Sequence, residues 1–155
     1  MKPLLSLVPA AALLAVGAAA AEPAGEGVYV PAAKLAAMVD KTTDGLATAS
    51  VPTGPGTALL IARRDADGQV EMHERLNDEF VVQKGTATVL VGGKVAGNRQ
   101  TAPGEWRGGK VSGAHAYRLG PGDVLWIPAG APHQVLKPAG GFTYLAFKFP
   151  AKPAP

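Results

Sequence analysis

One stretch of the sequence decides how this chain folds: Gly122-Asp-Val-Leu-Trp-Ile-Pro128-Ala-Gly130-Ala-Pro-His133. Residues 123–127 are a short run of bulky apolar residues, which is typical of a buried strand, and glycine and proline stand on both sides of it. Pro128 fixes the first dihedral of a tight turn, and Gly130 can adopt a positive φ. The chain is therefore expected to reverse direction here and to aim His133 from the start of an antiparallel strand.

Four residues of this stretch match the second sequence motif of the cupin superfamily, G-x5-P-x-G-x2-H: Gly122, Pro128, Gly130 and His133. The chain resembles cupins over roughly residues 57–149. Its sequence is also similar to the sequences of small bacterial cupins with no assigned function. The resemblance implies one all-β domain, a double-stranded β-helix or jelly-roll barrel.

The first cupin motif, G-x5-H-x-H-x3,4-E-x6-G, is matched only in part. His73 falls on its second histidine and Gly85 on its closing glycine. Counting back from Gly85 places Asp78 where the family has glutamate, while Glu71 replaces the first histidine and Asp65 the opening glycine. This alignment predicts that Asp78, rather than its neighbour Glu79, faces the barrel, although a β-bulge at Asn77 would reverse the two acids.

Short apolar runs between turn signals predict the strands of this barrel, and one amphipathic helix is predicted from Pro31 to about Asp40. Asp67-Gly68 is typical of a hairpin, Leu76-Asn77 and Gly85 read as turns, and residues 41–56 read as a connector. The predicted strands are 57–62, 69–73, 78–84, 86–91, 123–127 and 141–149.

The glycine-rich run 92–116 is expected to be a long loop without regular structure. It carries Glu105, Trp106, Arg107 and His115, which could fold over a barrel mouth. In the simpler interpretation, Trp106 only packs against the barrel. Arg63 and Arg64, at the end of strand 57–62, are expected to be solvated.

Composition limits the kind of protein. The 155 residues suit one domain. The absence of cysteine excludes disulfides and thiolate metal sites. The net charge of +3 comes from scattered basic residues, which do not indicate nucleic-acid binding. A basic start, an apolar run and Ala19-Ala20-Ala21 predict a secretory signal peptide, 1–21. The mature chain would then be periplasmic or secreted, without a stable membrane span, and would comprise a lead with the helix (22–56), the barrel (57–149) and a disordered tail (150–155).

If the two motif hairpins pair as in a cupin, Glu71, His73, Asp78 and His133 converge inside the barrel. Two imidazoles and two carboxylates suit a divalent transition metal, namely iron, manganese, nickel, cobalt or zinc, with iron or manganese favoured. Alternatively, Glu71 is not a ligand and three residues hold the metal. His115 lies outside both motifs.

Two functions follow from this site. The chain can be a metal-dependent enzyme, of oxygenase or isomerase type, acting on a small neutral or weakly polar molecule, or a non-catalytic module that binds a metal or a small ligand. No catalytic residue is identified, and only Glu105 or His115 could add an acid or base without being a ligand. The inward residues Phe80, Val82 and Val135 suggest a mostly apolar pocket. A homodimer formed through strands 57–62 and 142–149 is also expected.

Overall fold

A computed structural model of the chain describes residues 27–53 and 57–151. The predicted signal peptide, the first residues of the lead and the end of the tail from residue 152 lie outside the described residues. The elements, in chain order, are α1 (Ala32–Ala37), β1 (Leu46–Val51), β2 (Ala58–Arg64), β3 (Glu71–His73), β4 (Leu76–Val91), β5 (Lys94–Ala96), β6 (Arg99–Ala102), β7 (Glu105–Arg107), β8 (Lys110–Ser112), β9 (His115–Leu119), β10 (Val124–Ile127) and β11 (His133–Pro150).

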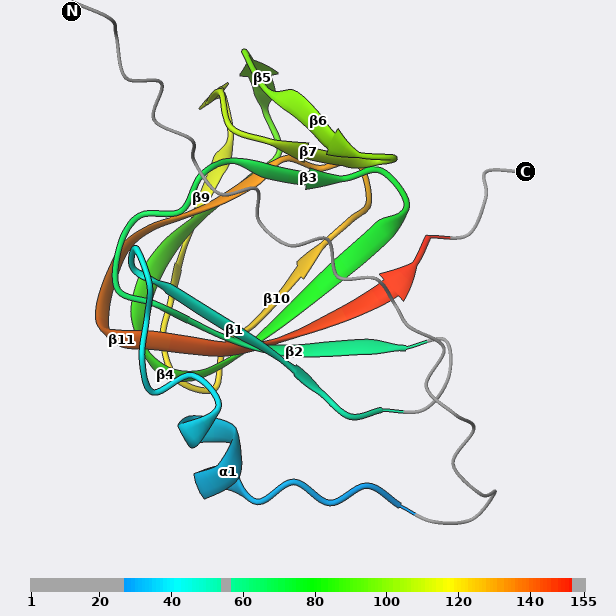
Figure 1. The fold of residues 1–155 in the computed structure, drawn as a ribbon. Coiled ribbons are helices and arrows are strands. Elements are labelled where there is room, and N and C mark those ends of the chain that lie inside the picture. The colour runs from blue at the N-terminus through cyan, green and yellow to red at the C-terminus, as the bar shows by residue number, and fades with distance from the viewer. Residues whose placement is uncertain (1–26, 54–56, 152–155) are drawn as a thin grey trace, which may run out of the picture.

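Nine of the described strands form one antiparallel sheet that curls round on itself (Figure 1). One path through the sheet runs β1-β2-β11-β3-β7-β6, and β4 pairs with β9, β10 and β11, while β5 and β8 form a separate two-stranded ribbon. The predicted fold class, an all-β cupin barrel with one short N-terminal helix, is confirmed.

The long strands β4 and β11 pair along most of their length, from Val91 opposite His133 to Leu76 opposite Pro150. The turn predicted at Gly85 is wrong, because Gly85 bends a strand that continues through it. Its φ is 73°, and a Cβ there would collide with the Ala139 carbonyl oxygen, so the bend requires glycine. Leu76 likewise lies in the strand and not in a turn, and Pro150 ends β11 instead of starting the tail.

Side chains alternate across β4, which gives the barrel its interior. Asp78, Phe80 and Val82 are buried, whereas the intervening Glu79 and Val81 are more exposed. The strands β10 and β11 alternate in the same way, since successive side chains of a strand point to opposite faces. The buried core inside the sheet comprises Ala62, Phe80, Val82, Ala87, Val89, Leu119, Leu125, Ile127, Val135, Phe142, Tyr144 and Ala146.

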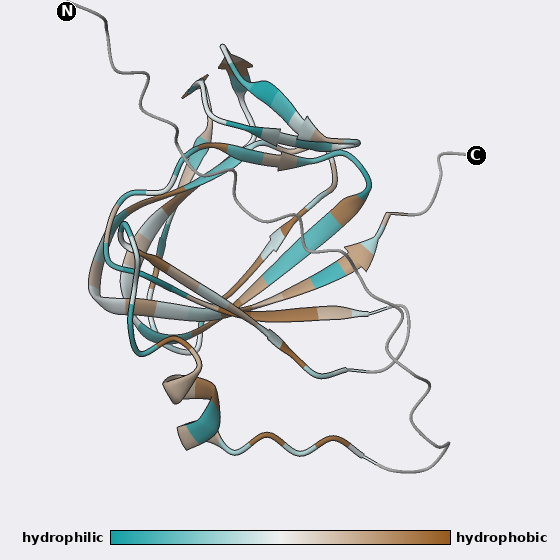
Figure 2. Ribbon diagram, in the orientation of Figure 1, coloured by the Kyte–Doolittle hydropathy of each residue, from teal (hydrophilic) through white to brown (hydrophobic). Residues whose placement is uncertain are grey.

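A second, smaller core lies on the outer face of the sheet, where Val39 packs with Val51 and Ile61 beside α1. The connector predicted for 41–56 is partly wrong, because β1 forms within it and pairs with β2. The half-buried residues of β1 are mostly alanines, which have little strand preference and gave no signal. Figure 2 shows that β2, between the two cores, is hydrophobic along most of its length. No helix within the described ranges is long and apolar enough to cross a membrane.

The run 92–116 is not an irregular loop, since it contains β5 to β8 and the first residues of β9. Strands β5 to β8 are three or four residues long, too short to show a period, and glycines with positive φ separate them. The hairpin predicted at Asp67-Gly68 is also wrong, because β2 pairs with β1 and β11, whereas β3 pairs with β7 and β11. The turn instead docks on β11: Gly68 N–H donates to the Val135 carbonyl, and Asp67 accepts from the Lys137 N–H.

Candidate metal centre

Two short strand pairings, β11 with β3 and β3 with β7, position three of the predicted ligands at one end of the barrel. His133, the first residue of β11, lies opposite Glu71 on β3. On the other side of β3, Glu71 lies opposite Arg107 and His73 opposite Glu105 of β7. Figure 1 shows β3 and β7 side by side at this end. The tight turn after Pro128, with Gly130 at a φ of 79°, starts β11 where the motif predicted.

Glu71, His73 and His133 can each place one ligand atom so that the three atoms lie within 4.8 Å of one another. Both histidines are buried, and their ring centroids are 5.4 Å apart. Three of the four predicted metal ligands therefore converge around one point. Two imidazoles and a carboxylate form a donor set that suits a divalent transition metal.

The outer nitrogen of each ring is held by the protein. His73 Nδ1 lies 2.6 Å from Glu105 Oε2, and His133 Nδ1 lies 3.3 Å from the Ala131 carbonyl oxygen. Since both partners accept, Nδ1 carries a proton in each ring. Metal-binding histidines are commonly held in this tautomer by an acceptor on the far side of the ring. Burial also lowers the pKa of His133, although Glu71 and Asp78 act in the opposite direction, so its neutral form is favoured.

Asp78 points into the barrel and Glu79 does not, as the motif alignment predicted. Asp78 Oδ2 lies 3.3 Å from His73 Nε2 and 3.6 Å from His133 Nε2. Asp78 is not one of the three residues that converge, and its other oxygen binds Lys148 Nζ at 2.6 Å. Burial alone would raise the pKa of Asp78, but His73 and Lys148 lower it to about 2. Asp78 is therefore ionised beside the two rings.

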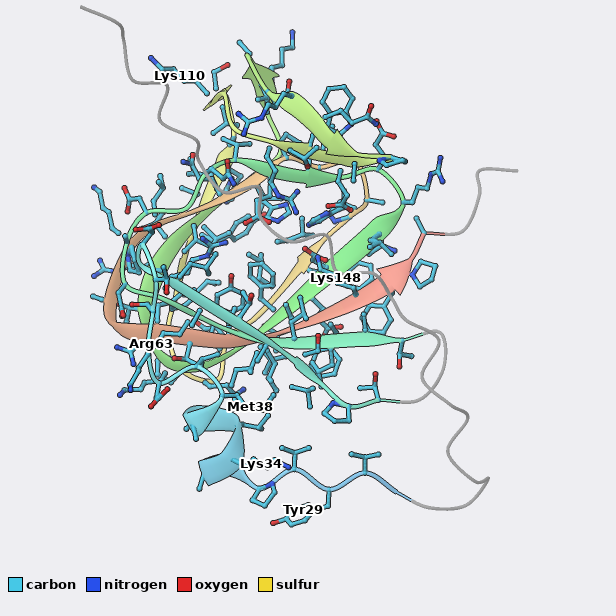
Figure 3. The ribbon with its side chains drawn as sticks, viewed as in Figure 1. Tyr29, Lys34, Met38, Arg63, Lys110 and Lys148 are labelled. Atoms are coloured by element: carbon cyan, nitrogen blue, oxygen red, sulfur yellow. The ribbon has the colours of Figure 1, made fainter. Side chains whose placement is uncertain are left out.

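Lys148 was missed by the sequence reasoning. Its Nζ lies 3.1 Å from His73 Nε2 in addition to its contact with Asp78, and Figure 3 shows Lys148 within the curve of the sheet. The alternation of side chains along β11 could have predicted its inward position. Phe142, Tyr144 and Ala146 face the core, and Lys148 is the next residue on that face.

Glu71 is held by two arginines. Arg64 Nη2 lies 2.6 Å from Glu71 Oε1, and Arg107 Nη2 lies 3.5 Å from Glu71 Oε2. Burial would raise the pKa of Glu71, but Arg107 and Arg64 together with the two histidines lower it. The carboxylate is therefore ionised and fixed in place, as ligand carboxylates commonly are. The same two ion pairs would hold Glu71 in the alternative in which it is not a ligand.

The expectation that Arg64 is solvated is wrong. Arg64 is buried at 8% exposure and donates to the Tyr144 hydroxyl as well as to Glu71. Arg63, its neighbour on the opposite face of β2, is half-exposed and pairs with Asp65, as expected of a surface arginine. Strand alternation again held the signal, because Ala62 and Arg64 share the inward face.

The mostly apolar pocket predicted from Phe80, Val82 and Val135 describes only part of the surroundings, since Phe80 packs edge-on against the His133 ring with centroids 6.1 Å apart. Those residues belong to the core, but the ligands are surrounded by charge. The cations Arg64, Arg107 and Lys148 pair with the anions Glu71, Glu105 and Asp78. With neutral histidines these six charges sum to zero, which is how buried charges are ordinarily tolerated.

Two other residues of 92–116, the exposed His115 and the half-buried Trp106, make their contacts outside the ligand cluster. The His115 ring is exposed and packs on Tyr117, with centroids 4.5 Å apart. Trp106 donates from Nε1 to Glu74 Oε1 at 2.7 Å and lies opposite Met72 in the β3–β7 pair. The simpler interpretation of Trp106 as an anchor is consistent with these contacts. Of the candidates in this run, Glu105 and Arg107 reach the site.

No family model matches the sequence, and no curated protein is significantly similar to it. Solved structures are similar in fold. A conserved protein of unknown function, SPY1581 from Streptococcus pyogenes, aligns with a TM-score of 0.55 at 15% identity over 88% of this chain and 99% of its own. TT1209 from Thermus thermophilus aligns with a TM-score of 0.54 at 19% identity, covering 75% and 93%. KdgF from Halomonas sp. aligns with a TM-score of 0.52 at 18% identity, covering 72% and 86%.

At these identities the comparisons bear on the fold alone. They agree with an antiparallel sheet that curls into a barrel. The chain therefore has the cupin barrel fold and carries, at one end of that barrel, a candidate metal centre built from Glu71, His73 and His133.

Proposed function

We propose that this protein binds one divalent transition metal in its barrel, with Glu71, His73 and His133 as ligands and Asp78 as the fourth. The observation that carries the proposal is the placement of the two buried imidazoles: Nδ1 of each ring contacts a protein acceptor, and the two rings converge on the fixed, ionised carboxylate of Glu71.

The donor chemistry narrows the metal. Imidazole and carboxylate groups suit iron, manganese, cobalt, nickel or zinc, and no thiolate exists in the chain to favour copper(I) or a structural zinc site. Iron or manganese is the preferred assignment, because both accept mixed nitrogen and oxygen ligands and six-fold coordination.

The proposed reaction type is that of a metal-dependent enzyme, an oxygenase or an isomerase, acting on a small molecule. A bound ion with three or four protein ligands would supply a Lewis acid that keeps open positions. The chain's own groups support catalysis beyond simple metal storage: Arg107 and Lys148 line the site with hydrogen-bond donors, and Glu105 holds the His73 proton. The alternative is a non-catalytic module that binds a metal or a small ligand.

Metal binding is tested by equilibrium dialysis of chelator-treated protein against manganese(II), iron(II) without oxygen, and zinc(II), followed by elemental analysis. We expect about one ion per chain in the wild type and loss of that ion in His133→Ala. The matched control is His115→Ala, which removes an exposed imidazole and should keep the ion. Equal binding by both variants would refute the proposed site.

The choice between enzyme and binding module needs a different readout. The metal-loaded protein is incubated with a mixture of small metabolites, and the mixture is followed by mass spectrometry. Turnover that disappears in the metal-free protein and in His133→Ala supports an enzyme. A ligand-dependent rise in Tm without any turnover supports the non-catalytic module.

We also propose that the protein pairs through the outer face of its sheet. Part of the face first expected to pair, including Leu59 and Leu145, packs against the chain's own outer core. Beyond it, Trp126 and Phe149 are half-exposed with ring centroids 5.9 Å apart. Light scattering should give the mass of two chains, and Trp126→Ser should lower it to one. A monomeric mass for the wild type at micromolar concentration would refute pairing.

A further inference from the structure

Lys148 places an ammonium group among the proposed metal ligands. It lies opposite Asp78 in the pairing of β11 with β4, and its side chain is 17% exposed. Its Nζ lies 2.6 Å from Asp78 Oδ1 and 3.1 Å from His73 Nε2. Figure 3 shows this contrast among the labelled lysines: Lys148 lies inside the curve of the sheet, whereas Lys110 projects from the surface.

The contact with His73 constrains what else that ring can bind. An ammonium group can only donate, so His73 Nε2 accepts the hydrogen bond from Lys148 and Nδ1 donates to Glu105. A neutral imidazole has one lone pair on Nε2, and a metal ion would use the same lone pair. Lys148 and a metal therefore cannot be bonded to His73 at the same time.

The charges around the site lead to the same conclusion. Arg64 and Arg107 are paired with Glu71 and Glu105, whereas Lys148 is paired with Asp78. A divalent ion adds two positive charges to a set that sums to zero without it. Repulsion between the ion and an ammonium group a few ångströms away is strong in a buried site, so Lys148 must move when the metal binds.

We infer that Lys148 is an internal competitor for the metal: its ammonium group holds Asp78 and the lone pair of His73 in the metal-free protein, and metal binds by displacing it. This inference rests on the proposed metal function and adds a resident cation that weakens the site. Asp78 is a partner of Lys148 in the metal-free state and becomes a metal ligand when the ammonium group leaves.

The test is metal affinity, measured by isothermal titration calorimetry of chelator-treated protein with manganese(II) or zinc(II) alone as the probe. Lys148→Met removes the ammonium group and keeps the length and the apolar stem. We expect it to bind metal at least about tenfold more tightly than the wild type, because the displacement step is gone. Lys148→Arg keeps the charge and should not gain affinity. Lys110→Met, on the surface ribbon, is the matched control and should be unchanged.

The outcomes separate the inference from the proposed function on which it rests. Metal binding by the wild type with equal or weaker binding by Lys148→Met would overturn the role of Lys148 and leave the metal site standing. Absence of binding in every variant would overturn the metal site itself. If Lys148→Met does not fold, the crystal structure of the metal-loaded wild type decides: we expect Lys148 Nζ to have left His73 Nε2, and a retained hydrogen bond between them would refute the inference.

Discussion

Replacing Asp78 by asparagine keeps the shape of the side chain and removes the charge that faces Lys148. Asp78 Oδ1 lies 2.6 Å from Lys148 Nζ, and the Asp78 side chain is 3% exposed. Burial raises the pKa of this carboxyl group, but His73 and Lys148 lower it further, so that it falls from 3.8 to about 2. That difference corresponds to about 2 kcal/mol of stability at neutral pH. Because asparagine also leaves a largely buried ammonium group unpaired, we expect a total loss of about 2 to 4 kcal/mol for Asp78→Asn.

The assay is urea unfolding of the metal-free protein, followed by the fluorescence of Trp106 and Trp126. The pKa of Asp78 is lower in the folded than in the unfolded protein, so its contribution is present above about pH 3.8 and is lost as the pH falls through about 2. The difference in unfolding free energy between wild type and Asp78→Asn should therefore shrink across that interval. The control is Glu79→Gln, on the more exposed face of the same strand.

A loss below about 0.5 kcal/mol in Asp78→Asn at pH 7, the size typical of a surface substitution, would refute the Asp78–Lys148 pair. An equal loss in Glu79→Gln would show that the strand register has been assigned wrongly.

Acid release of the metal, the bend at Gly85 and export can each be tested separately. Burial lowers the pKa of His133, although Glu71 and Asp78 act in the opposite direction. The metal should therefore stay bound somewhat below the usual histidine pKa of about 6.5 and be released at lower pH. An ion content that is unchanged from about pH 7.5 to 4.5 would contradict ligation by His133. Gly85→Ala should lower the free energy of unfolding in urea by at least about 2 kcal/mol, because its Cβ would meet the Ala139 carbonyl oxygen. Gly113→Ala, also at positive φ but in open space, should lower it by about 1 kcal/mol. Equal losses would contradict the close approach at Gly85. N-terminal sequencing of native protein should begin at Glu22, and recovery of Met1 would contradict export.

The sequence was sufficient to predict the parts of the site that are local. His133 follows a turn whose proline and glycine define its geometry, and Glu71 and His73 are two residues apart on one short strand. The choice of Asp78 over Glu79 could be predicted too, because the resemblance to the first cupin motif places Asp78 at the acidic position, and alternation along the strand then turns Glu79 to the other face. The ligand residues could therefore be predicted from the resemblance to the cupin motifs together with strand alternation.

The charged surroundings of the ligands could not be predicted as a network, because they depend on pairings distant in sequence. Glu105 reaches His73 because β7 pairs with β3, which is distant from it in the sequence. β7 is only three residues long, too short for its pairing to be predicted. Arg64 and Lys148 lie on the inward faces of β2 and β11, which the two-residue period marks, but their partners, Glu71 and Asp78, belong to other strands. Arg64 was expected to be solvated because it stands at the end of a strand, but its inward position was the better guide. A charged residue at an inward position of a barrel strand thus indicates a site.

A metal ion bound between two histidines whose Nε2 atoms point to one place is the feature on which the proposed function depends. Anomalous diffraction from a crystal soaked in manganese(II) or zinc(II) tests it most directly, because the signal locates the ion independently of any activity. We predict a single strong anomalous peak per chain within bonding distance of His73 Nε2, His133 Nε2 and a Glu71 carboxylate oxygen. An ion bound elsewhere, for example at the exposed His115, with Lys148 still hydrogen-bonded to His73, would contradict this metal centre.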